Sequence, residues 1–539
     1  MPSLKQRDAL KSLHLAVPGW KPPVYAVFLL AFAAVYAAHW PLLHLPYYWD
    51  EAGYYIPAAF DFFRSGSLIP FSTLSNAHPP LPSIYLAAFW KVFGYSPFVT
   101  RSAMCAMAAL ALTAVWRIAL IVSVNIRVAL ATLLLTAVYP VFFAQSSLAH
   151  ADLFAAAATL WALAFYLNRR TWPAVVCFAL AALSKETAII TPLALAGWQL
   201  WIALRTRSSK PARVAAALAI PVVPLALWYL YYWHRTGFIF GNPYYLRYNA
   251  TATLTPLRFL VALWHRTNQL ALHMDMFVPV LLAVACLLLD RVTQNEVAAP
   301  DREHRSLLLV VIIANALFFS ILGGALLTRY LLPVYPLILL LCALAFRARL
   351  RHWAWLAAFS LLAFVVALFV NPPYRFAPED NLAYVDMIHL QQDAISQILA
   401  RYPNQTVLTA WPASDELTKP YLGYVSQPVP TTTIDDFSLQ QIQHAAQADD
   451  SYTVALIFST KYAPSWSITF GRFNQRMDAR YFDFHRDLDP VIVARLLGGQ
   501  VVWNEHRKGQ WAAVLHFDRP PQSRLALTSP TQPFRSYNP

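Results

Sequence analysis

Acidic residues are scarce in the first 370 residues of this 539-residue chain, so each one is a candidate for chemistry. The segment 47–54 reads YYWDEAGY and places Asp50 and Glu51 among aromatic side chains, with Tyr54 at its end. Aromatic neighbours withdraw water from a carboxyl group, which favours proton uptake near neutral pH and suits a general base. Two adjacent acids could also bind a cation. The alternative is an aromatic belt at a membrane boundary, in which Asp50 caps a helix.

Two further groups of polar residues interrupt apolar segments. Asp152 follows His150 at the start of an apolar run, where a helix-capping role is the alternative to a functional one. Lys185 and Glu186 lie between two apolar runs. A lysine at a membrane edge could bind a lipid phosphate, whereas the simpler interpretation is a self-neutralising Lys–Glu pair at a hairpin turn.

Two cationic candidates complete the set. His78 precedes two prolines, so it could face a phosphate or a metal, although a helix-start signal explains this motif better. Arg329 is followed by Tyr330 in the segment TRYLLP at 328–333. An arginine binds phosphate bidentately, and the alternative is a side chain that extends to the membrane surface.

The elements that position these residues are predicted to be membrane helices. Hydrophobic residues make up 58% of the chain and charged residues 13%, with a mean hydropathy of +0.44. This composition is far from that of a soluble domain. The formal charge of +14 does not indicate nucleic-acid binding, because the arginines lie in the gaps between apolar segments. Apolar segments near the length of a span are 23–43, 98–118, 127–146, 150–168, 172–185, 187–204, 211–233, 270–290, 306–325, 331–347 and 352–370.

Charge asymmetry predicts the topology of these eleven spans. If 79–96 is a juxtamembrane or re-entrant helix rather than a span, the basic clusters at 117–127, 169–170, 205–213 and 347–351 all face the cytoplasm. The first outer loop is then 44–97. Every acid before residue 370 falls on the outer face, except Asp8 and those of the loop 290–303. We therefore expect one site at the outer surface of a cytoplasmic (inner) membrane.

The composition changes at residue 371, which predicts a membrane domain at 1–370 and a soluble extracytoplasmic α/β domain at 371–539. The second segment holds 16 of the 27 acidic residues. Strands are predicted at 405–411, 453–459 and 511–517, and helices at 383–402 and 439–448. All four cysteines lie in apolar segments, so no disulfide framework is predicted.

The order of the motifs resembles that of the GT-C glycosyltransferases, in particular the group with the lipid A aminoarabinose transferase and bacterial enzymes related to protein mannosyltransferases. The resemblance covers residues 20–347, and its motifs are the acid pair after the first span, HPPL at 78–81, FG at 93–94 with Arg101, Asp152, SKE at 184–186, and RYLLP at 329–333. It implies a polytopic α-helical transferase of the cell envelope that takes a sugar from a polyprenyl phosphate and glycosylates a lipid, glycan or protein.

The resemblance also implies roles for residues. Asp50 corresponds to the essential acid of the first loop, assisted by Glu51, and Asp152 corresponds to the second acid. His78, Lys185 and Arg329 would bind the donor phosphate, with Tyr54, Arg101, Glu186 and Tyr330 as further candidates. His78 and Glu186 stand where the family has lysine and glycine. A divalent metal at Asp50 and Asp152 is a further option.

Three other functions compete with this one. A transporter or flippase would have charges near the bilayer midplane and repeated halves, which the sequence lacks. A ligase or polymerase of surface glycans would use the basic residues of loop 234–269, which are His234, Arg235, Arg247, Arg258, His265 and Arg266. A scaffold would bind a partner through its soluble domain. Membrane lipids are expected partners, and nucleic acid is not.

Overall fold

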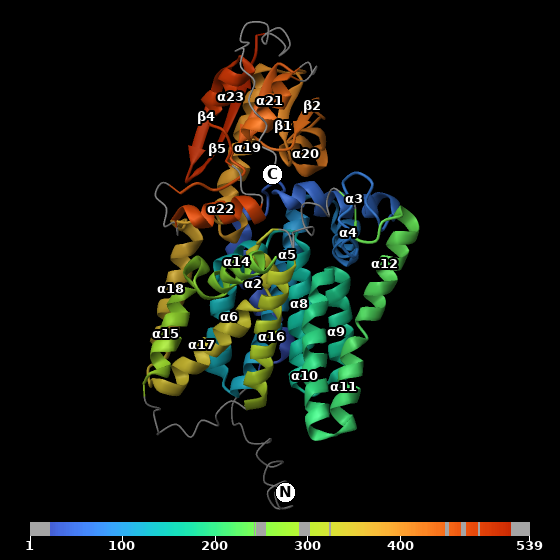
Figure 1. Ribbon diagram of the computed structural model, residues 1–539, viewed down its shortest axis with the longest axis vertical. Helices are drawn as coiled ribbons and strands as arrows, with labels where there is room; N and C mark the ends of the chain where they lie inside the picture. The colour runs from blue at the N-terminus through green and yellow to red at the C-terminus, as the bar shows by residue number, and fades with distance from the viewer. Residues whose placement is uncertain are drawn as a thin grey trace, which may run out of the picture.

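Long helices and a small β-sheet occupy different ends of the molecule. The computed structural model describes residues 22–241, 243, 255–289, 302–322, 325–447, 452–464, 471–482 and 486–518. The long helices run roughly parallel, and the sheet lies beyond one end of them (Figure 1). This end is called the sheet-bearing end below.

The helical body contains twelve of the described helices. They are α2 (Val24–His39), α5 (Pro97–Ser123), α6 (Ile126–Val138), α8 (Ala151–Leu167), α9 (Thr171–Ser184), α10 (Ile190–Thr206), α11 (Ser209–Ala219), α12 (Val222–Thr236), α15 (Phe277–Leu287), α16 (Arg302–Ile321), α17 (Tyr335–Arg349) and α18 (Ala354–Phe369). Side chains fix some of the helix starts. Ser96 accepts a hydrogen bond from the Val99 amide before α5, and Asn125 accepts one from the Val128 amide before α6.

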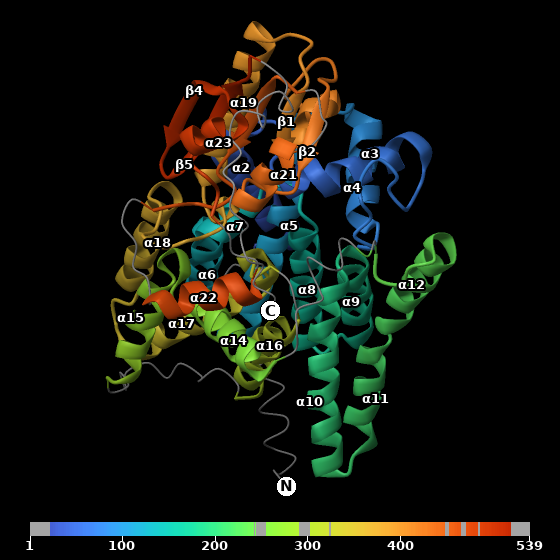
Figure 2. The same cartoon turned by 45° about the horizontal axis from the view of Figure 1, so that its top comes forward.

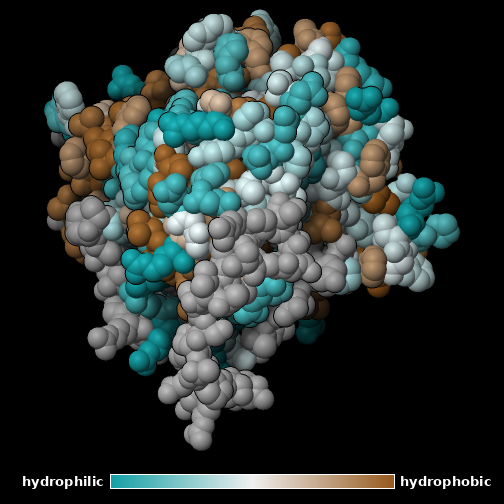
Figure 3. All heavy atoms as spheres, turned by 90° about the horizontal axis from the view of Figure 1, so that it is seen from above, coloured by the Kyte–Doolittle hydropathy of each residue, from teal (hydrophilic) through white to brown (hydrophobic). Residues whose placement is uncertain are grey.

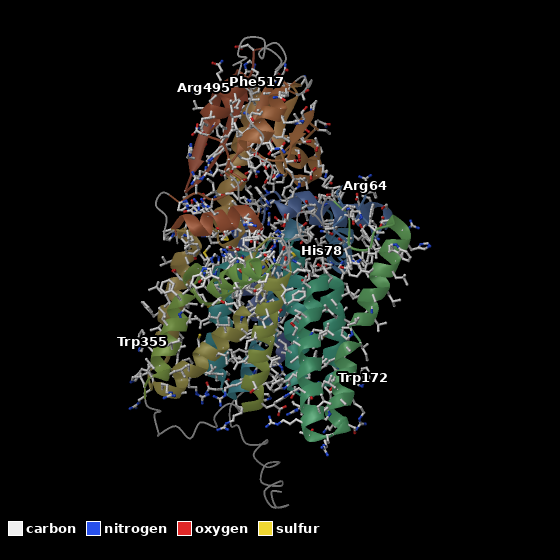
Figure 4. All side chains as sticks on the ribbon, viewed as in Figure 1. Arg64, His78, Trp172, Trp355, Arg495 and Phe517 are labelled. Atoms are coloured by element: carbon white, nitrogen blue, oxygen red, sulfur yellow. The ribbon has the colours of Figure 1, made fainter. Side chains whose placement is uncertain are left out.

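Five described helical segments are long and apolar enough to cross a membrane. They are Val24–Leu42, Pro97–Ser123, Glu186–Thr206, Ser209–Thr236 and Arg302–Ile321. Each of the eleven predicted spans contains a helix, although several are shorter than a bilayer requires. Large apolar side chains point away from the body, as Trp172 and Trp355 do on its flanks (Figure 4), where they are 66% and 76% exposed. Apolar exposure on this scale fits contact with lipid.

Proline interrupts two of the predicted spans. The segment 127–146 divides at Pro140 into α6 and the short α7 (Pro140–Gln145). The segment 211–233 divides at Pro221 into α11 and α12. A proline has no amide hydrogen to donate within a helix, which explains both breaks.

Several shorter helices gather at the sheet-bearing end. In Figures 1 and 2, α14 (Pro256–Ala271) and α22 (Gly471–Tyr481) lie across the ends of the long helices. Helix α3 (Ile56–Ser65) packs on α4 (Leu81–Phe93). With 13 residues, α4 is about 20 Å long, shorter than the roughly 30 Å hydrocarbon core of a bilayer.

The remaining short helical segments connect these elements. They are η1 (Trp40–Leu42), η2 (Glu51–Tyr55), η3 (Glu186–Ile189), η4 (His273–Asp275), η5 (Thr328–Leu331), η6 (Pro378–Asp380), α20 (Ala413–Thr418) and η7 (Pro420–Leu422).

The sheet has five strands in the order β2-β1-β3-β5-β4. Its strands are β1 (Val407–Ala410), β2 (Thr431–Ile434), β3 (Val454–Phe458), β4 (Gln500–Arg507) and β5 (Gln510–His516). Strands β2, β1 and β3 are parallel, while β5 is antiparallel to both β3 and β4. The sheet forms the sheet-bearing part of the molecule together with three helices, α19 (Ala383–Arg401), α21 (Leu439–Gln447) and α23 (Pro490–Leu497).

The three strands and two helices predicted from apolar runs are present. The prediction missed β2 and β4, which are the two edge strands. Edge strands bury fewer side chains: β4 reads QVVWNEHR, with no fully buried residue, and β2 reads TTTI. Neither has the continuous apolar run that marks a buried strand.

The core of the sheet continues into the first loop of the helical body. Tyr48 and Leu148 belong to the same buried cluster as the strand residues. Tyr424 donates a hydrogen bond to the carbonyl of Tyr47, and Tyr95 donates one to the carbonyl of Tyr421. The sheet-bearing part therefore rests directly on residues 47–48, next to the candidate Asp50. Figure 3 looks onto this end, where hydrophilic residues predominate and hydrophobic ones form separate patches.

Candidate active site

The guanidinium of Arg329, in η5, is the centre of a cluster of charged side chains. Its Nη2 donates to Asp50 Oδ2, and its Nη1 donates to Glu379 Oε1. Its Nε donates to Asp152 Oδ2 at 3.2 Å. Three carboxylates from distant parts of the sequence therefore share one guanidinium.

The three carboxylates differ in their access to solvent. The side chain of Asp50 is 20% exposed, whereas those of Asp152 and Glu379 are 2% and 4% exposed. A group that exchanges a proton with a substrate must reach it. Asp50 is therefore the carboxylate of the cluster that is best placed for such an exchange.

Lys185 extends the cluster on the side of Asp152. It lies in extended conformation at the break between α9 and η3, and its Nζ is 2.6 Å from Asp152 Oδ1. The same ammonium lies 4.0 Å from the centre of the Tyr330 ring. A carboxylate and an aromatic face thus hold the cation at a buried position, where it would attract an anion strongly.

Glu379 comes from the segment that links α18 to the sheet-bearing part. Two adjacent acids of this segment bind two adjacent residues of η5: Glu379 binds Arg329, and Asp380 accepts a hydrogen bond from Thr328 Oγ1. His273 Nε2 lies 2.9 Å from the other oxygen of Asp380. The linker is therefore part of the wall of the site.

The backbone around Asp50 is unusual. Trp49 has a φ of 46°, in the left-handed region that non-glycine residues rarely adopt, and a π-helical turn, η2, follows Asp50. Such conformations occur often at functional sites. The turn directs Asp50 towards Arg329, while the Trp49 ring packs edge-on against Trp411 and Phe458 of the sheet-bearing part.

The ring of Trp411 packs against the same turn, η2. Its ring lies 5.2 Å from that of Tyr54, and it is so close to Gly53 that a Cβ atom there would overlap the indole. Glycine is therefore required at position 53 for steric reasons. Through Trp411, the position of the sheet-bearing part is coupled to that of Asp50.

Glu51 faces away from this cluster, into a second buried ion pair. Arg101 Nη2 lies 3.3 Å from Glu51 Oε2, and both side chains are fully buried. Glu51 also accepts hydrogen bonds from the amides of Ala149 and Tyr48. Burial raises the pKa of Glu51, and the charge of Arg101 opposes this rise.

Arg101 binds three carbonyl groups in addition to Glu51. These are the carbonyls of Leu45, Pro46 and Ser147, at 3.0, 2.6 and 3.0 Å. The Glu51–Arg101 pair thereby ties the first loop to the turn before α8. The pair thereby holds in place the two segments that carry Asp50 and Asp152.

His78 and Glu186 form a third pair beside the cluster. His78 Nδ1 lies 2.7 Å from Glu186 Oε2, and the ring of Tyr55 stacks parallel to the imidazole. Figure 4 shows His78 at the level where the long helices end and the sheet-bearing part begins. The side chains of His78 and Glu186 are 12% and 24% exposed, so this pair borders the site rather than lining its floor.

Arg266 brings a further buried cation from α14. Its guanidinium lies 5.8 Å from the Tyr330 ring, whose other neighbour is Lys185. Its hydrogen bonds go to Gln269 Oε1 and to the carbonyls of Leu327 and Phe319. An arginine bound to neutral oxygens keeps its full positive charge for an anion.

A pocket opens between α8, η3, α16 and η5. Its charged lining residues are Asp152, Lys185 and Arg329, and Tyr330 and Asn315 line it as well. Ala155, Ala156 and Phe319 add apolar lining. Charged and apolar side chains therefore line the same pocket.

The residues of the cluster do not make a metal site. Asp50 and Asp152 both direct an oxygen at Arg329, so a cation stands where a metal would have to bind. No group of three or more histidine, cysteine or acidic side chains in the described ranges could hold a metal ion.

The structure brings most of the predicted site residues together. Asp50, Asp152, Lys185, Arg329 and Tyr330 are in direct contact, His78 and Glu186 border them, and Tyr54 lies against Trp411. Glu51 and Arg101 contact each other instead of Arg329. Sequence analysis missed Glu379 and assigned no role in transfer to Arg266. The signal for Glu379 was its position, nine residues after the last predicted span and next to Asp380.

Comparisons with known proteins agree with this architecture. Residues 77–228 match the family described as dolichyl-phosphate-mannose-protein mannosyltransferase. The apo structure of ArnT from Cupriavidus metallidurans is similar over 91% of this chain and 98% of that chain, with a TM-score of 0.50 and 14% identity. The same protein bound to undecaprenyl phosphate gives a TM-score of 0.49, 14% identity and coverage of 91% and 97%.

A more distant likeness involves the Pmt1-Pmt2 complex of S. cerevisiae bound to the sugar donor. It covers 43% of this chain and 35% of that chain, with a TM-score of 0.34 and 17% identity. No curated protein sequence matches the chain significantly. The resemblance to the GT-C glycosyltransferases is confirmed by the family match and the shared fold.

Proposed function

We propose that this chain, which has the GT-C fold, is a membrane glycosyltransferase that moves a sugar from a polyprenyl phosphate to an acceptor on the outer face of the cytoplasmic membrane. The observation that carries the proposal is the cluster in which Arg329 binds Asp50, Asp152 and Glu379 beside Lys185. This cluster contains a candidate base, Asp50, and two cations, Lys185 and Arg329, which line one pocket together with Asp152.

The donor supplies a phosphate that must leave with its negative charge. When the bond between C1 of the sugar and the phosphate oxygen breaks, the electron pair stays on that oxygen. Fixed cations stabilise this charge without a proton donor. Lys185 and Arg329 line the pocket and are the residues proposed to bind the phosphate, with Arg266 and His78 next to them.

The acceptor supplies a hydroxyl group whose proton must be removed as the new bond forms. We assign this task to Asp50, because it is the most exposed carboxylate of the cluster. The acceptor oxygen bonds to C1, its proton moves to Asp50, and the polyprenyl phosphate is released. A single displacement of this kind inverts the configuration at C1.

Asp152 and Glu51 have supporting tasks in this proposal. Asp152 orients Lys185 and Arg329, since it accepts from both. Glu51 acts indirectly, by holding the backbone of the first loop in place, because its carboxylate is buried in the ion pair with Arg101. Both are positioning residues in this assignment, and Asp50 is the catalytic one.

A transfer assay with purified protein tests the proposal. Full-length protein in lipid nanodiscs is supplied with labelled polyprenyl-phosphate hexoses and pentoses and with an envelope lipid extract as acceptor. We expect release of polyprenyl phosphate that depends on the protein, and at least a hundredfold loss in Asp50→Asn. Asp435→Asn, at an exposed residue of the sheet-bearing part, is the matched control.

Two results would contradict the proposal. Full transfer by both Asp50→Asn and Asp152→Asn would remove the carboxylates from the mechanism. Transfer of a preassembled oligosaccharide from a polyprenyl diphosphate, with no use of monosaccharide donors, would favour a ligase. In that case loss of activity should follow substitutions of α14, such as His265→Ala, more closely than Asp50→Asn.

A further inference from the structure

Two buried polar atoms next to Arg329 have no hydrogen-bond partner among the described residues. They are Oε2 of Glu379 and Nε2 of His150, and they lie 3.9 Å apart. The two side chains are 4% and 0% exposed. An unsatisfied buried polar atom destabilises the folded state, so two that face each other require a physical explanation.

The hydrogen bonds around His150 determine which of its nitrogens carries the proton. Gln145 donates through Nε2 to the carbonyl of Glu379 at 3.3 Å, so its Oε1 is an acceptor. This Oε1 lies 2.8 Å from His150 Nδ1, which must therefore be the donor. In the neutral imidazole, Nε2 is then a bare acceptor that points at Glu379.

A carboxylate oxygen and a bare imidazole nitrogen are both acceptors. They repel each other unless a proton lies between them, and their separation of 3.9 Å is only slightly longer than a hydrogen bond. A protonated Glu379 would supply that proton, donating from Oε2 to Nε2. Its Oε1 would still accept from Arg329 as a carbonyl oxygen.

The charges around the site favour a neutral Glu379. The cluster contains three carboxylates, Asp50, Asp152 and Glu379, but two cations, Arg329 and Lys185. Asp380 lies next to Glu379 in η6 and adds negative charge. One carboxylate in excess at a buried position is costly, and protonation removes that cost.

The pKa of Glu379 agrees with this reasoning. It is raised to about 8, because burial disfavours the charged carboxylate, although the charge of Arg329 opposes the rise. The negative charges of Asp50, Asp380 and Asp152 raise the pKa further. A carboxyl group with this pKa is protonated at neutral pH and loses its proton under mildly alkaline conditions.

We propose that Glu379 and His150 hold one proton between Oε2 and Nε2, and that this proton keeps Glu379 neutral and leaves Asp50 as the base of the Arg329 cluster. The pair is a positioning device carried by the linker to the sheet-bearing part. When the proton is lost, a third negative charge competes for Arg329. The added charge also repels the donor phosphate.

The predicted effects on transfer activity rest on the proposed transferase function. Glutamine has the shape of a protonated glutamate, so Glu379→Gln should retain at least a third of wild-type transfer at pH 7. Wild-type transfer should fall at least fivefold between pH 7 and pH 9, with a rising KM for the donor. Glu379→Gln should not show this fall. Glu416→Gln, which neutralises another buried carboxyl outside the cluster, is the matched control and should keep the wild-type pH profile.

A second measurement does not depend on transfer. Infrared difference spectra between pH 6 and pH 10 are recorded in a Glu416→Gln background, so that the buried carboxyl group of Glu416 does not contribute. They should contain the band of a protonated carboxyl group that is absent when Glu379→Gln is added. His150→Leu should move this transition to lower pH, because the protonated carboxyl loses its acceptor. His150→Gln, which places an amide oxygen near the position of Nε2, should restore it.

The transfer assay and the infrared titration can each contradict the inference separately. A loss of more than tenfold in Glu379→Gln at every pH would mean that Glu379 acts as an ionised partner of Arg329. An infrared transition that persists unchanged in Glu379→Gln would exclude Glu379 as the proton holder, even if no donor supports transfer. Absence of transfer with a normal infrared result would contradict the proposed function and leave the proton pair standing.

Discussion

Asp50 and Glu379 bind opposite nitrogens of the same guanidinium, that of Arg329. One acid lies in the first loop and the other in the linker after the last helix of the body. The Arg329 cluster is therefore complete only when the first loop, η5 and the linker have all reached their final positions.

Arg329→Lys should abolish most of the activity. A lysine provides one point charge and cannot bind three carboxylates at fixed angles as a guanidinium does. We expect a loss of about a hundredfold in transfer and a destabilisation of about 3–5 kcal/mol, which is typical when a buried ion pair is broken. Transfer rates and thermal unfolding of the purified protein measure both. Arg347→Lys, at a partly buried arginine bonded to the Ser123 carbonyl, should change neither by more than a small fraction.

Glu51→Gln and Asp50→Asn should separate stability from catalysis. Glu51 is sealed against Arg101, so its loss leaves a buried charge without a partner and should lower the unfolding temperature markedly. Asp50 is partly exposed, so Asp50→Asn should lose transfer while the unfolding temperature changes by only a few degrees. Equal unfolding temperatures in the two variants would argue against a structural role for Glu51.

Gly53→Ala should disturb the contact between the first loop and the sheet-bearing part. The new Cβ overlaps the indole of Trp411, and overpacking of this kind costs about 1–3 kcal/mol. Transfer should fall as well, because the same turn directs Asp50. Gly197→Ala, where a Cβ would meet no atom within 4 Å, is the control. The double variant Gly53→Ala/Trp411→Ala should be more stable than Gly53→Ala alone if the overlap is the cause.

Lys185→Met should raise the KM for the donor at least tenfold with a smaller effect on kcat. The substitution keeps the length of the side chain but removes the charge proposed to bind the phosphate. Tyr330→Phe keeps the ring that lies 4.0 Å from Nζ and should change KM less than twofold. Steady-state kinetics over a range of donor concentrations distinguishes the two cases. An unchanged KM in Lys185→Met would remove Lys185 from donor binding.

Glu416→Gln should stabilise the protein at neutral pH. Glu416 is fully buried in α20, and neither of its carboxylate oxygens has a partner among the described residues. Burial raises its pKa well above the ordinary value of 4.5, and Asp415 adds to the rise. The folded state then holds a proton that the unfolded state releases as pH rises above about 4.5. Stability is therefore greatest below that pH and falls by about 1.4 kcal/mol per pH unit until the folded pKa is reached.

Thermal unfolding at several pH values checks this sign. The unfolding temperature of the wild type should decrease between pH 5 and pH 8 more steeply than that of Glu416→Gln. Asp415→Asn should have a smaller effect in the same direction, because Lys419 already pairs with Asp415. A steeper decrease in Glu416→Gln than in the wild type would be the opposite of the expected result.

The sequence alone was sufficient to predict the mostly helical body and to mark several residues of the candidate cluster. Runs of about 20 apolar residues report burial in lipid or in a helical core, and helices occupy every predicted segment. Charged residues at the edges of such runs are costly, and this marked Asp152, Lys185 and Arg329 as candidates. Proline breaks at Pro140 and Pro221 were not anticipated, since apolarity does not report helix continuity.

Only the tertiary structure decided which of these charges meet. The separation of Asp50, Asp152, Arg329 and Glu379 along the chain contains no information on distance, and the packing of η2, α8, η5 and η6 brings them to one guanidinium. The tertiary structure also places the side chains of the neighbours Asp50 and Glu51 in different ion pairs, because a helical turn directs adjacent side chains to different sides. Glu379 joined the site because the linker folds back onto η5, where a buried arginine needs carboxylates to offset its charge.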